Sequence, residues 1–263
     1  MGHSAYLDHL AIAAESWDDL WPRYRGELGG QWVSGGESWG FAPAQLRYAN
    51  GMKIEALMPH MPERNDFLRR FLDRRGPGAH HVTFKVPDIT AAIDQVETAG
   101  YRPVGIDLSD ATWKEAFIHP KDGPGIVVQL AEAPAEWSSP APAGFPPTSI
   151  ESAATLDYIG LAVTDTPRAV ELFVGLLDGE LTGTGSDESF STDYTDLRWS
   201  SGGVIRLFDA PQWIEQGERG RLHHAAFTVS DPQAMSEAKP LDDGRFEVAP
   251  EANLGVRLVM TAS

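Results

Sequence analysis

Two histidines, one glutamate and one glutamine stand in strand-like stretches where together they could ligate a metal ion: His9, Glu55, His81 and Gln129. Glu55 and Gln129 are flanked by apolar residues, and a carboxylate in such a strand is costly to bury unless a cation stands opposite. Two imidazoles, one carboxylate and one amide oxygen form a reasonable N/O set for a divalent ion, with a net site charge of about +1. An anionic or enolate oxygen could then bind at the open positions.

Each of these residues also has a simpler structural interpretation. A histidine in a strand is commonly a hydrogen-bonded structural residue, and Glu55 could face solvent at a sheet edge. The metal site is favoured because all four residues occupy matched positions in an internal repeat. Four stretches with period-2 apolar patterning recur at intervals of roughly 70 residues. They span residues 7–13, 78–86, 156–163 and 222–229.

The repeat gives each half of the chain an equivalent set of positions. In the first half these positions hold His9, Glu55, His81 and Gln129. In the second half they hold Tyr158, Arg206, His224 and Val259. Three of these are poor metal ligands, so the second half is interpreted as a degenerate copy in which His224 is structural or lines a pocket. If the first unit paired with the fourth, the set would be His9, Glu55, His224 and Val259, and ligand quality favours pairing of the first two units.

Each repeat is predicted to be a β-α-β-β-β unit. The first has a helix over 16–28, irregular near Pro22, and strands over 31–34, 39–48 and 52–58, with a hairpin turn at Asn50-Gly51. A separate amphipathic helix is expected over 63–75. The second unit has a helix over 88–99 and strands over 102–106, 112–119 and 125–131. The third unit has a helix over 166–177 and a strand ending at 208. The fourth unit has a weak helix near 231–238 and a strand over 255–261.

The four units predict an α+β protein of two tandem domains. We expect a first, metal-binding domain over residues 1–133 and a second, degenerate domain over residues 154–263. Between them, residues 134–153 are rich in proline, alanine and serine and lack a periodic apolar face, which is typical of a semi-extended linker.

Composition excludes several classes of partner and chemistry. The net charge of −17 argues against nucleic acid or an anionic membrane as partner, since both attract basic surfaces. The absence of cysteine removes disulfides, thiolate nucleophiles and cysteine-based zinc sites. No apolar run approaches the ~20 residues of a membrane span, and the start of the chain lacks the pattern of a secretion signal. We therefore expect a cytoplasmic protein with a small-molecule substrate, as a monomer or homodimer.

Aromatic residues on the predicted strands could line an organic-substrate pocket. The candidates are Trp32, Trp39, Phe41 and Trp113, joined by His119 before a turn. Core packing explains these residues equally well, so their place in a pocket is an open alternative.

Two stretches resemble the vicinal oxygen chelate superfamily, which includes glyoxalase I, methylmalonyl-CoA epimerase, extradiol dioxygenases and bleomycin-resistance proteins. Residues 67–76 followed by 79–84 look like the epimerase segment before its second ligand strand, and residues 117–130 look like its final hairpin. The resemblance implies tandem domains with cup-shaped mixed sheets and one divalent ion, such as Zn, Ni, Co, Mn or Fe, at the four positions named first.

The resemblance also implies a function. It suggests an isomerase or lyase that binds a small substrate through vicinal oxygens and stabilises an enolate or oxyanion. In the epimerases, glutamine is usual at the Glu55 position and glutamate at the Gln129 position, so the two appear exchanged here. Since Gln129 cannot act as a base, Glu55 is the candidate catalytic residue, and the exchange makes a dioxygenase less favoured. The alternative is a non-catalytic protein of the bleomycin-resistance type that sequesters a ligand.

Overall fold

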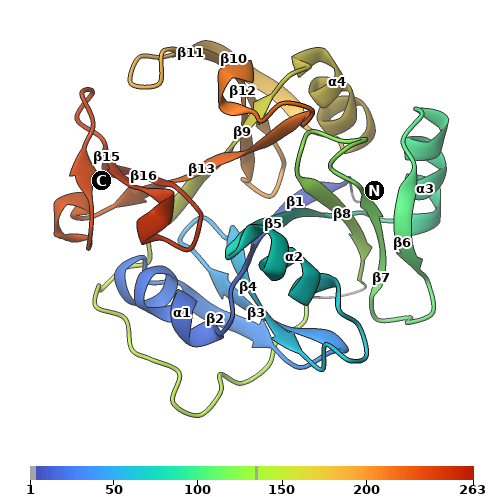
Figure 1. The fold of residues 1–263 in the computed structure, drawn as a ribbon, viewed down its shortest axis with the longest axis horizontal. Coiled ribbons are helices and arrows are strands. Elements are labelled where there is room, and N and C mark those ends of the chain that lie inside the picture. Colours follow the sequence, from blue (N-terminus) through green and yellow to red (C-terminus); the bar gives the residue numbers. More distant parts are fainter. Residues whose placement is uncertain (1–3, 134–135) are drawn as a thin grey trace. The chain divides into compact units, whose positions relative to one another are not determined.

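The computed structural model describes residues 4–133 and 136–263 and contains two eight-stranded mixed sheets (Figure 1). The first sheet has the order β2-β3-β4-β1-β5-β8-β7-β6 and the second the order β10-β11-β12-β9-β13-β16-β15-β14. The second order is the first with eight added to each strand number. The α+β fold built from four repeated units is therefore confirmed.

The strands of the first sheet follow the predicted repeat closely. Their bounds are β1 Tyr6–Ala13, β2 Gln31–Gly35, β3 Gly40–Arg47, β4 Lys53–His60, β5 Gly78–Lys85, β6 Pro103–Asp107, β7 Lys114–Ile118 and β8 Val127–Glu132. Strands β1 and β4 pair in parallel, as do β5 and β8, whereas β3 with β4 and β7 with β8 are antiparallel. The hairpin predicted at Asn50-Gly51 joins β3 to β4.

The second sheet repeats this pairing with shorter strands in its last unit. Its strands are β9 Thr155–Val163, β10 Glu180–Asp187, β11 Thr192–Arg198, β12 Val204–Asp209, β13 Gly220–Val229, β14 Lys239–Pro240, β15 Phe246–Val248 and β16 Leu258–Ala262. Strand β9 pairs in parallel with β12, and β13 with β16.

The helices differ from expectation where proline intervenes. The first begins as α1 (Trp17–Leu20), capped by Ser16, and continues as the wider-wound η1 (Trp21–Glu27), which starts next to Pro22. Proline has no N–H to donate to the preceding turn, which explains the irregularity expected there. The remaining helices are α2 Phe67–Arg75, α3 Ile89–Thr98, α4 Thr166–Val170 and its continuation η2 Glu171–Leu176, with single turns η3 Pro211–Trp213, η4 Pro232–Ala234 and η5 Pro250–Ala252.

Two helix predictions need correction. Helix α2 begins at Phe67, four residues later than expected, and residues 63–66 precede it as turn and coil. The helix expected over 231–238 is wrong: only the single turn η4 forms there. Met235 is already extended, and Glu237 has a φ of 62°, which an α-helix does not accommodate.

Contact density divides the chain into two compact units. Unit A holds residues 4–8, 81–133, 136 and 158–224, and unit B holds residues 9–80, 137–157 and 225–263. The boundaries fall within individual strands, so they do not coincide with the domains expected over 1–133 and 154–263, which stay a prediction. The expected linker begins at residue 134, and residues 134 and 135 lie outside the described part of the chain.

Each unit has its own buried aromatic core. In unit A, Phe84 packs against Phe173 and Trp199, with ring centroids 5.7 and 5.1 Å apart. In unit B, the Tyr48 hydroxyl donates to the carbonyl of Tyr24 at 3.0 Å. The described helices include none long and apolar enough to cross a bilayer.

The segment from 136 to 153 contains neither helix nor strand, and its role as a linker stays a prediction. It is nevertheless held in place by contacts with other residues of unit B. The Trp32 indole donates to the carbonyl of Ser139 at 2.8 Å, and Arg25 donates to the carbonyl of Pro146 at 2.9 Å. Phe145 packs 5.2 Å from the Trp32 ring.

Candidate metal centre

His9 and Glu55 come together through the parallel pairing of β1 and β4. His9 is fully buried and Glu55 is 7% exposed. His9 Nε2 lies 3.4 Å from Glu55 Oε2. The alternative that Glu55 faces solvent at a sheet edge is therefore wrong. Strand β4 lies between two other strands, and the carboxylate of Glu55 is buried.

Gln45 is a third member of this group that the sequence interpretation missed. The antiparallel register of β3 and β4 places Gln45 directly opposite Glu55. Its amide donates to Glu55 Oε1 at 3.1 Å and lies 3.5 Å from His9 Nδ1. The Asn50-Gly51 turn could have predicted this pairing, since residues at equal distance from a hairpin turn face each other. Gln45 therefore fixes one oxygen of the carboxylate.

His81 and Gln129 lie on the neighbouring strands β5 and β8 of unit A. Both are buried, at 5% and 6% exposure. The Gln129 amide is held at both ends: Oε1 accepts from the Thr83 hydroxyl at 2.6 Å, and Nε2 donates to Glu115 Oε2 at 2.7 Å. The Trp113 indole donates to the same Glu115 oxygen at 2.8 Å. The sequence interpretation did not identify Thr83 or Glu115, which depend on pairing across β5, β8 and β7.

His9, Glu55 and His81 each offer one ligand atom, and these atoms all lie within 4.8 Å of one another. Within residues 4–133 and 136–263 this is the one such group of histidines and acidic residues. Two imidazole nitrogens and a carboxylate oxygen suit Zn²⁺ and other first-row divalent ions, so the donor set fits the expected cofactor. Gln129 as a fourth ligand stays a prediction.

The adjacent His80 has a different environment. Its ring packs edge-on against Phe71 and Phe67, with centroids 4.8 and 5.7 Å away. Burial lowers the pKa of His80 to about 4, although the negative charge of Glu55 acts in the opposite direction. His80 is therefore neutral near pH 7, and its apolar contacts indicate a packing role.

The aromatic pocket candidates lie in different places. Trp32 packs within an aromatic cluster with Trp21 and Phe145, and Phe41 packs 5.5 Å from Phe67. Trp39 is 70% exposed. Trp113 hydrogen-bonds to Glu115 beside Gln129, whereas His119 is exposed and accepts from the backbone of Lys121. Substrate contact by any of them stays a prediction.

At the equivalent positions of the second sheet, side chains contact one another. His224 is fully buried, and its Nε2 lies 3.0 Å from the Tyr158 hydroxyl. Arg206 makes two hydrogen bonds to Asp196, at 2.7 and 2.8 Å, and its guanidinium lies over the Tyr158 ring at 4.2 Å. Val259 is buried. The interpretation of this half as a degenerate copy stays a prediction.

Comparison with known proteins connects this geometry to a family. The model of the Glyoxalase/Bleomycin resistance protein/Dioxygenase superfamily matches residues 8–119. The ethylmalonyl-CoA/methylmalonyl-CoA epimerase of Cereibacter sphaeroides is 30% identical over 132 residues, which cover 48% of this chain and 96% of that protein. The chain belongs to this superfamily. The matched region includes His9, Glu55 and His81, so the candidate ligands lie in the part of the chain that carries the family likeness.

Solved structures extend the likeness in fold. A variant of 4-hydroxymandelate synthase from Streptomyces coelicolor covers 99% of this chain and 94% of its own, with a TM-score of 0.63 and 13% identity. This match spans both sheets, so that enzyme shares the two-sheet fold of the chain. Methylmalonyl-CoA epimerase from Mycobacterium tuberculosis is 28% identical, covers 49% of this chain and 89% of its own, and has a TM-score of 0.44.

Proposed function

We propose that this chain is a metal-dependent isomerase that acts on a small coenzyme A thioester, which it binds through vicinal oxygens. The observation that carries the proposal is the buried group of His9, Glu55 and His81, whose ligand atoms lie within 4.8 Å of one another. The epimerase relative, which matches over nearly its whole length, supports the substrate class. Isomerisation next to a thioester carbonyl needs an enolate, and a cationic site stabilises one.

The protein's own residues prepare the site in this proposal. His9 and His81 would hold the ion as neutral imidazoles and Glu55 would hold it as a carboxylate. The bound ion would supply the positive charge that polarises the thioester carbonyl. Gln45 holds Glu55 Oε1 at 3.1 Å, so the orientation of the carboxylate is set before substrate arrives.

Proton transfer is assigned to Glu55. Gln129 has no basic atom, and its amide nitrogen already donates to Glu115. In the proposed reaction Glu55 Oε2 accepts the proton from the substrate carbon next to the carbonyl, which leaves an enolate. Return of the proton by Glu55 to the same face restores the original configuration, and a proton taken from solvent on the opposite face inverts it.

Hydrogen exchange at the substrate carbon tests the proposal. Metal-loaded protein is incubated in D₂O with methylmalonyl-CoA, and deuterium incorporation is followed by mass spectrometry against the uncatalysed background. We expect incorporation by the parent protein and a loss of at least ~100-fold in Glu55→Gln, since general base catalysis contributes about 10²–10⁴. Glu132→Gln, on the far end of β8, serves as the control and retains activity.

Two outcomes would contradict the assignment. Metal-loaded parent protein that exchanges no α-hydrogen with methylmalonyl-CoA, ethylmalonyl-CoA or a related acyl-CoA rules out the reaction. Full exchange by Glu55→Gln rules out Glu55 as the base. The sequestration alternative stays a prediction, and the packing of Trp32 and Phe41 against rings of the chain itself gives it no specific support.

A further inference from the structure

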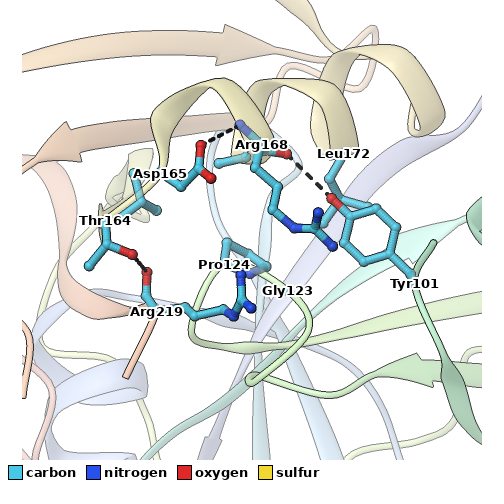
Figure 2. Close-up of a pocket in the computed structure, with 10 residues that line it drawn as sticks. Tyr101, Gly123, Pro124, Thr164, Asp165, Arg168, Leu172 and Arg219 are labelled. Atoms are coloured by element: carbon cyan, nitrogen blue, oxygen red, sulfur yellow. Dashed lines mark hydrogen bonds between the residues drawn. The ribbon is translucent and has the colours of Figure 1, made fainter. Parts of the chain in front are cut away.

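A small pocket in unit A lies between the turn before β8 and the start of α4 (Figure 2). Tyr101 and Pro124 line one side, and Asp165 and Arg168 line the other, with Arg219 completing the wall. Its volume is about 20 Å³, which is room for one water molecule or for one end of a larger ligand. All of these residues belong to unit A.

Two arginines, Arg168 and Arg219, line this pocket. Within the described part of the chain, neither Arg168 nor Arg219 has a carboxylate oxygen within salt-bridge distance. The nearby Asp165 accepts the backbone N–H of Arg168 at 3.0 Å and so caps the start of α4. The guanidinium of Arg168 lies 4.6 Å from the centre of the Tyr101 ring, which holds it at the pocket wall.

The Nε atom of Arg168 is the clearest sign of an absent acceptor. It is buried, and none of the described residues accepts a hydrogen bond from it. A buried donor left unsatisfied is destabilising, and more so when the group is charged. An anionic oxygen placed in the pocket would recover this energy, because guanidinium groups bind phosphate and carboxylate oxygens with two parallel hydrogen bonds.

The charges of Arg168 and Arg219 both act on the Tyr101 hydroxyl. Burial raises the pKa of the Tyr101 hydroxyl; the positive charges of Arg168 and Arg219 act to lower it, and the negative charges of Glu171 and Asp165 act to raise it. Both side chains extend toward the Gly123-Pro124 turn in Figure 2. The residues that line the pocket include these two arginines and one carboxylate, that of Asp165, which accepts the backbone N–H of Arg168.

We propose that Arg168 and Arg219 bind a phosphate group in this pocket, and that the group is carried by coenzyme A. The second part rests on the proposed function. Pro124 precedes Gln129 by five residues, so even a fully extended chain separates the two by no more than about 18 Å. The extended pantetheine arm of coenzyme A can cover this span. The second half of the chain would then contribute substrate binding, although its own sheet lacks a ligand set.

Binding measurements with three probes test the proposal. Calorimetric titrations of the full chain use coenzyme A, pantetheine and inorganic phosphate, each at two salt concentrations. We expect coenzyme A to bind more tightly than pantetheine, and the Arg168→Gln/Arg219→Gln double variant to bind coenzyme A at least tenfold more weakly. Arg221→Gln removes an exposed arginine two residues from Arg219 and is expected to leave binding unchanged. Divalent-ion content is expected to be equal in all variants.

The outcomes separate this proposal from the proposed function. Equal affinity of parent and double variant for coenzyme A and for phosphate, or binding of neither probe by the parent, overturns the pocket. Phosphate binding that the double variant loses, with coenzyme A bound no better than pantetheine, overturns the coenzyme assignment. α-Hydrogen exchange on an acyl-pantetheine thioester reports on the metal site alone. An Arg168→Lys variant keeps the charge and guards against a folding defect, and it is expected to bind coenzyme A with intermediate affinity.

Discussion

The carboxylate of Glu55 lies 3.4 Å from the imidazole of His9, and both side chains are buried in the first sheet. Burial of a carboxylate carries a desolvation cost, which hydrogen bonds such as that from Gln45 offset in part. A divalent ion bound by both groups would outweigh this desolvation cost. The pair therefore links the stability of the protein to metal binding.

Glu55→Gln is expected to have opposite effects with and without metal. Glutamine keeps the shape and loses the charge, so the affinity for Zn²⁺ or Mn²⁺ should fall at least tenfold, which equals about 1.4 kcal/mol. In chelator-treated protein the same change removes a buried charge and should leave the free energy of unfolding equal or higher, by up to about 1 kcal/mol. Metal analysis and thermal unfolding, each with and without the ion, measure both effects.

Asp157→Asn provides a matched control for this prediction. Asp157 is a partly buried carboxylate that accepts a hydrogen bond from Thr228 at 2.8 Å, and burial raises its pKa. It lies outside the His-Glu-His group, so its substitution should alter stability equally in loaded and chelated protein. A metal affinity of Glu55→Gln within twofold of the parent would contradict the site, as would stoichiometric metal in a His9→Ala/His81→Ala double variant.

A second prediction concerns the hydrogen-bonded pair Gln129 and Glu115. Gln129→Glu would replace an N–H···O bond of 2.7 Å by two facing carboxylates. We expect this variant to lose about 1–3 kcal/mol of unfolding free energy at pH 8 in the absence of metal. Adding Glu115→Gln should restore most of the loss, because an amide again faces a carboxylate. Urea denaturation of the two single variants and the double variant measures the coupling.

Gln95→Glu on the exposed side of α3 controls for the added charge, and it is expected to change stability by less than about 0.5 kcal/mol. Additive effects of the two substitutions would disprove the coupling. The result bears on the exchange of glutamate and glutamine between positions 55 and 129. If the coupling is observed, glutamate at position 129 is expected to need a neutral residue at position 115.

The sequence predicted the fold well because its repeat is carried by local signals. Period-2 strands, the Asn50-Gly51 turn and the capping Asp88 of α3 are all determined within a few residues. The helix near 231–238 failed because its weak apolar periodicity was outweighed by the extended backbone at Met235 and the positive φ of Glu237.

The candidate site was predictable only in part. His9, Glu55 and His81 could be found from matched repeat positions alone. Thr83 and Glu115 could not, because their contacts with Gln129 depend on pairing between strands that are distant in the sequence. Arg168 and Arg219 carry no motif, and only the folded chain places them around one pocket.

A third prediction follows from Glu132 at the end of β8. It accepts the Ile89 backbone N–H at 2.8 Å and the Lys114 ammonium at 2.6 Å, and these hydrogen bonds lower the pKa of its carboxyl below the ordinary value of 4.5. Because the folded pKa is the lower one, the stabilisation is complete above about pH 4.5 and is lost as the pH falls through the folded pKa.

Glu132→Gln should therefore lower the free energy of unfolding by about 0.5–1 kcal/mol at pH 7, with little difference from the parent at pH 3. Urea titrations at a series of pH values measure this. Glu97→Gln on the exposed face of α3 is the control, and its difference from the parent should not follow the same pH profile. A constant difference for Glu132→Gln across the series would count against a charge-dependent role.

The last prediction contrasts two glycines in unit A. A Cβ at Gly160 on β9 would lie 2.9 Å from the His224 ring and 3.0 Å from Phe208, within a fully buried cluster. Gly160→Ala is therefore expected to destabilise the protein by about 1–3 kcal/mol through overpacking. Gly175 lies in η2, where an added Cβ meets no atom within 4 Å, so Gly175→Ala should be neutral or stabilise by up to about 1 kcal/mol. Denaturation midpoints of the two variants decide the matter, and equal effects would show that His224 and Phe208 can shift without cost.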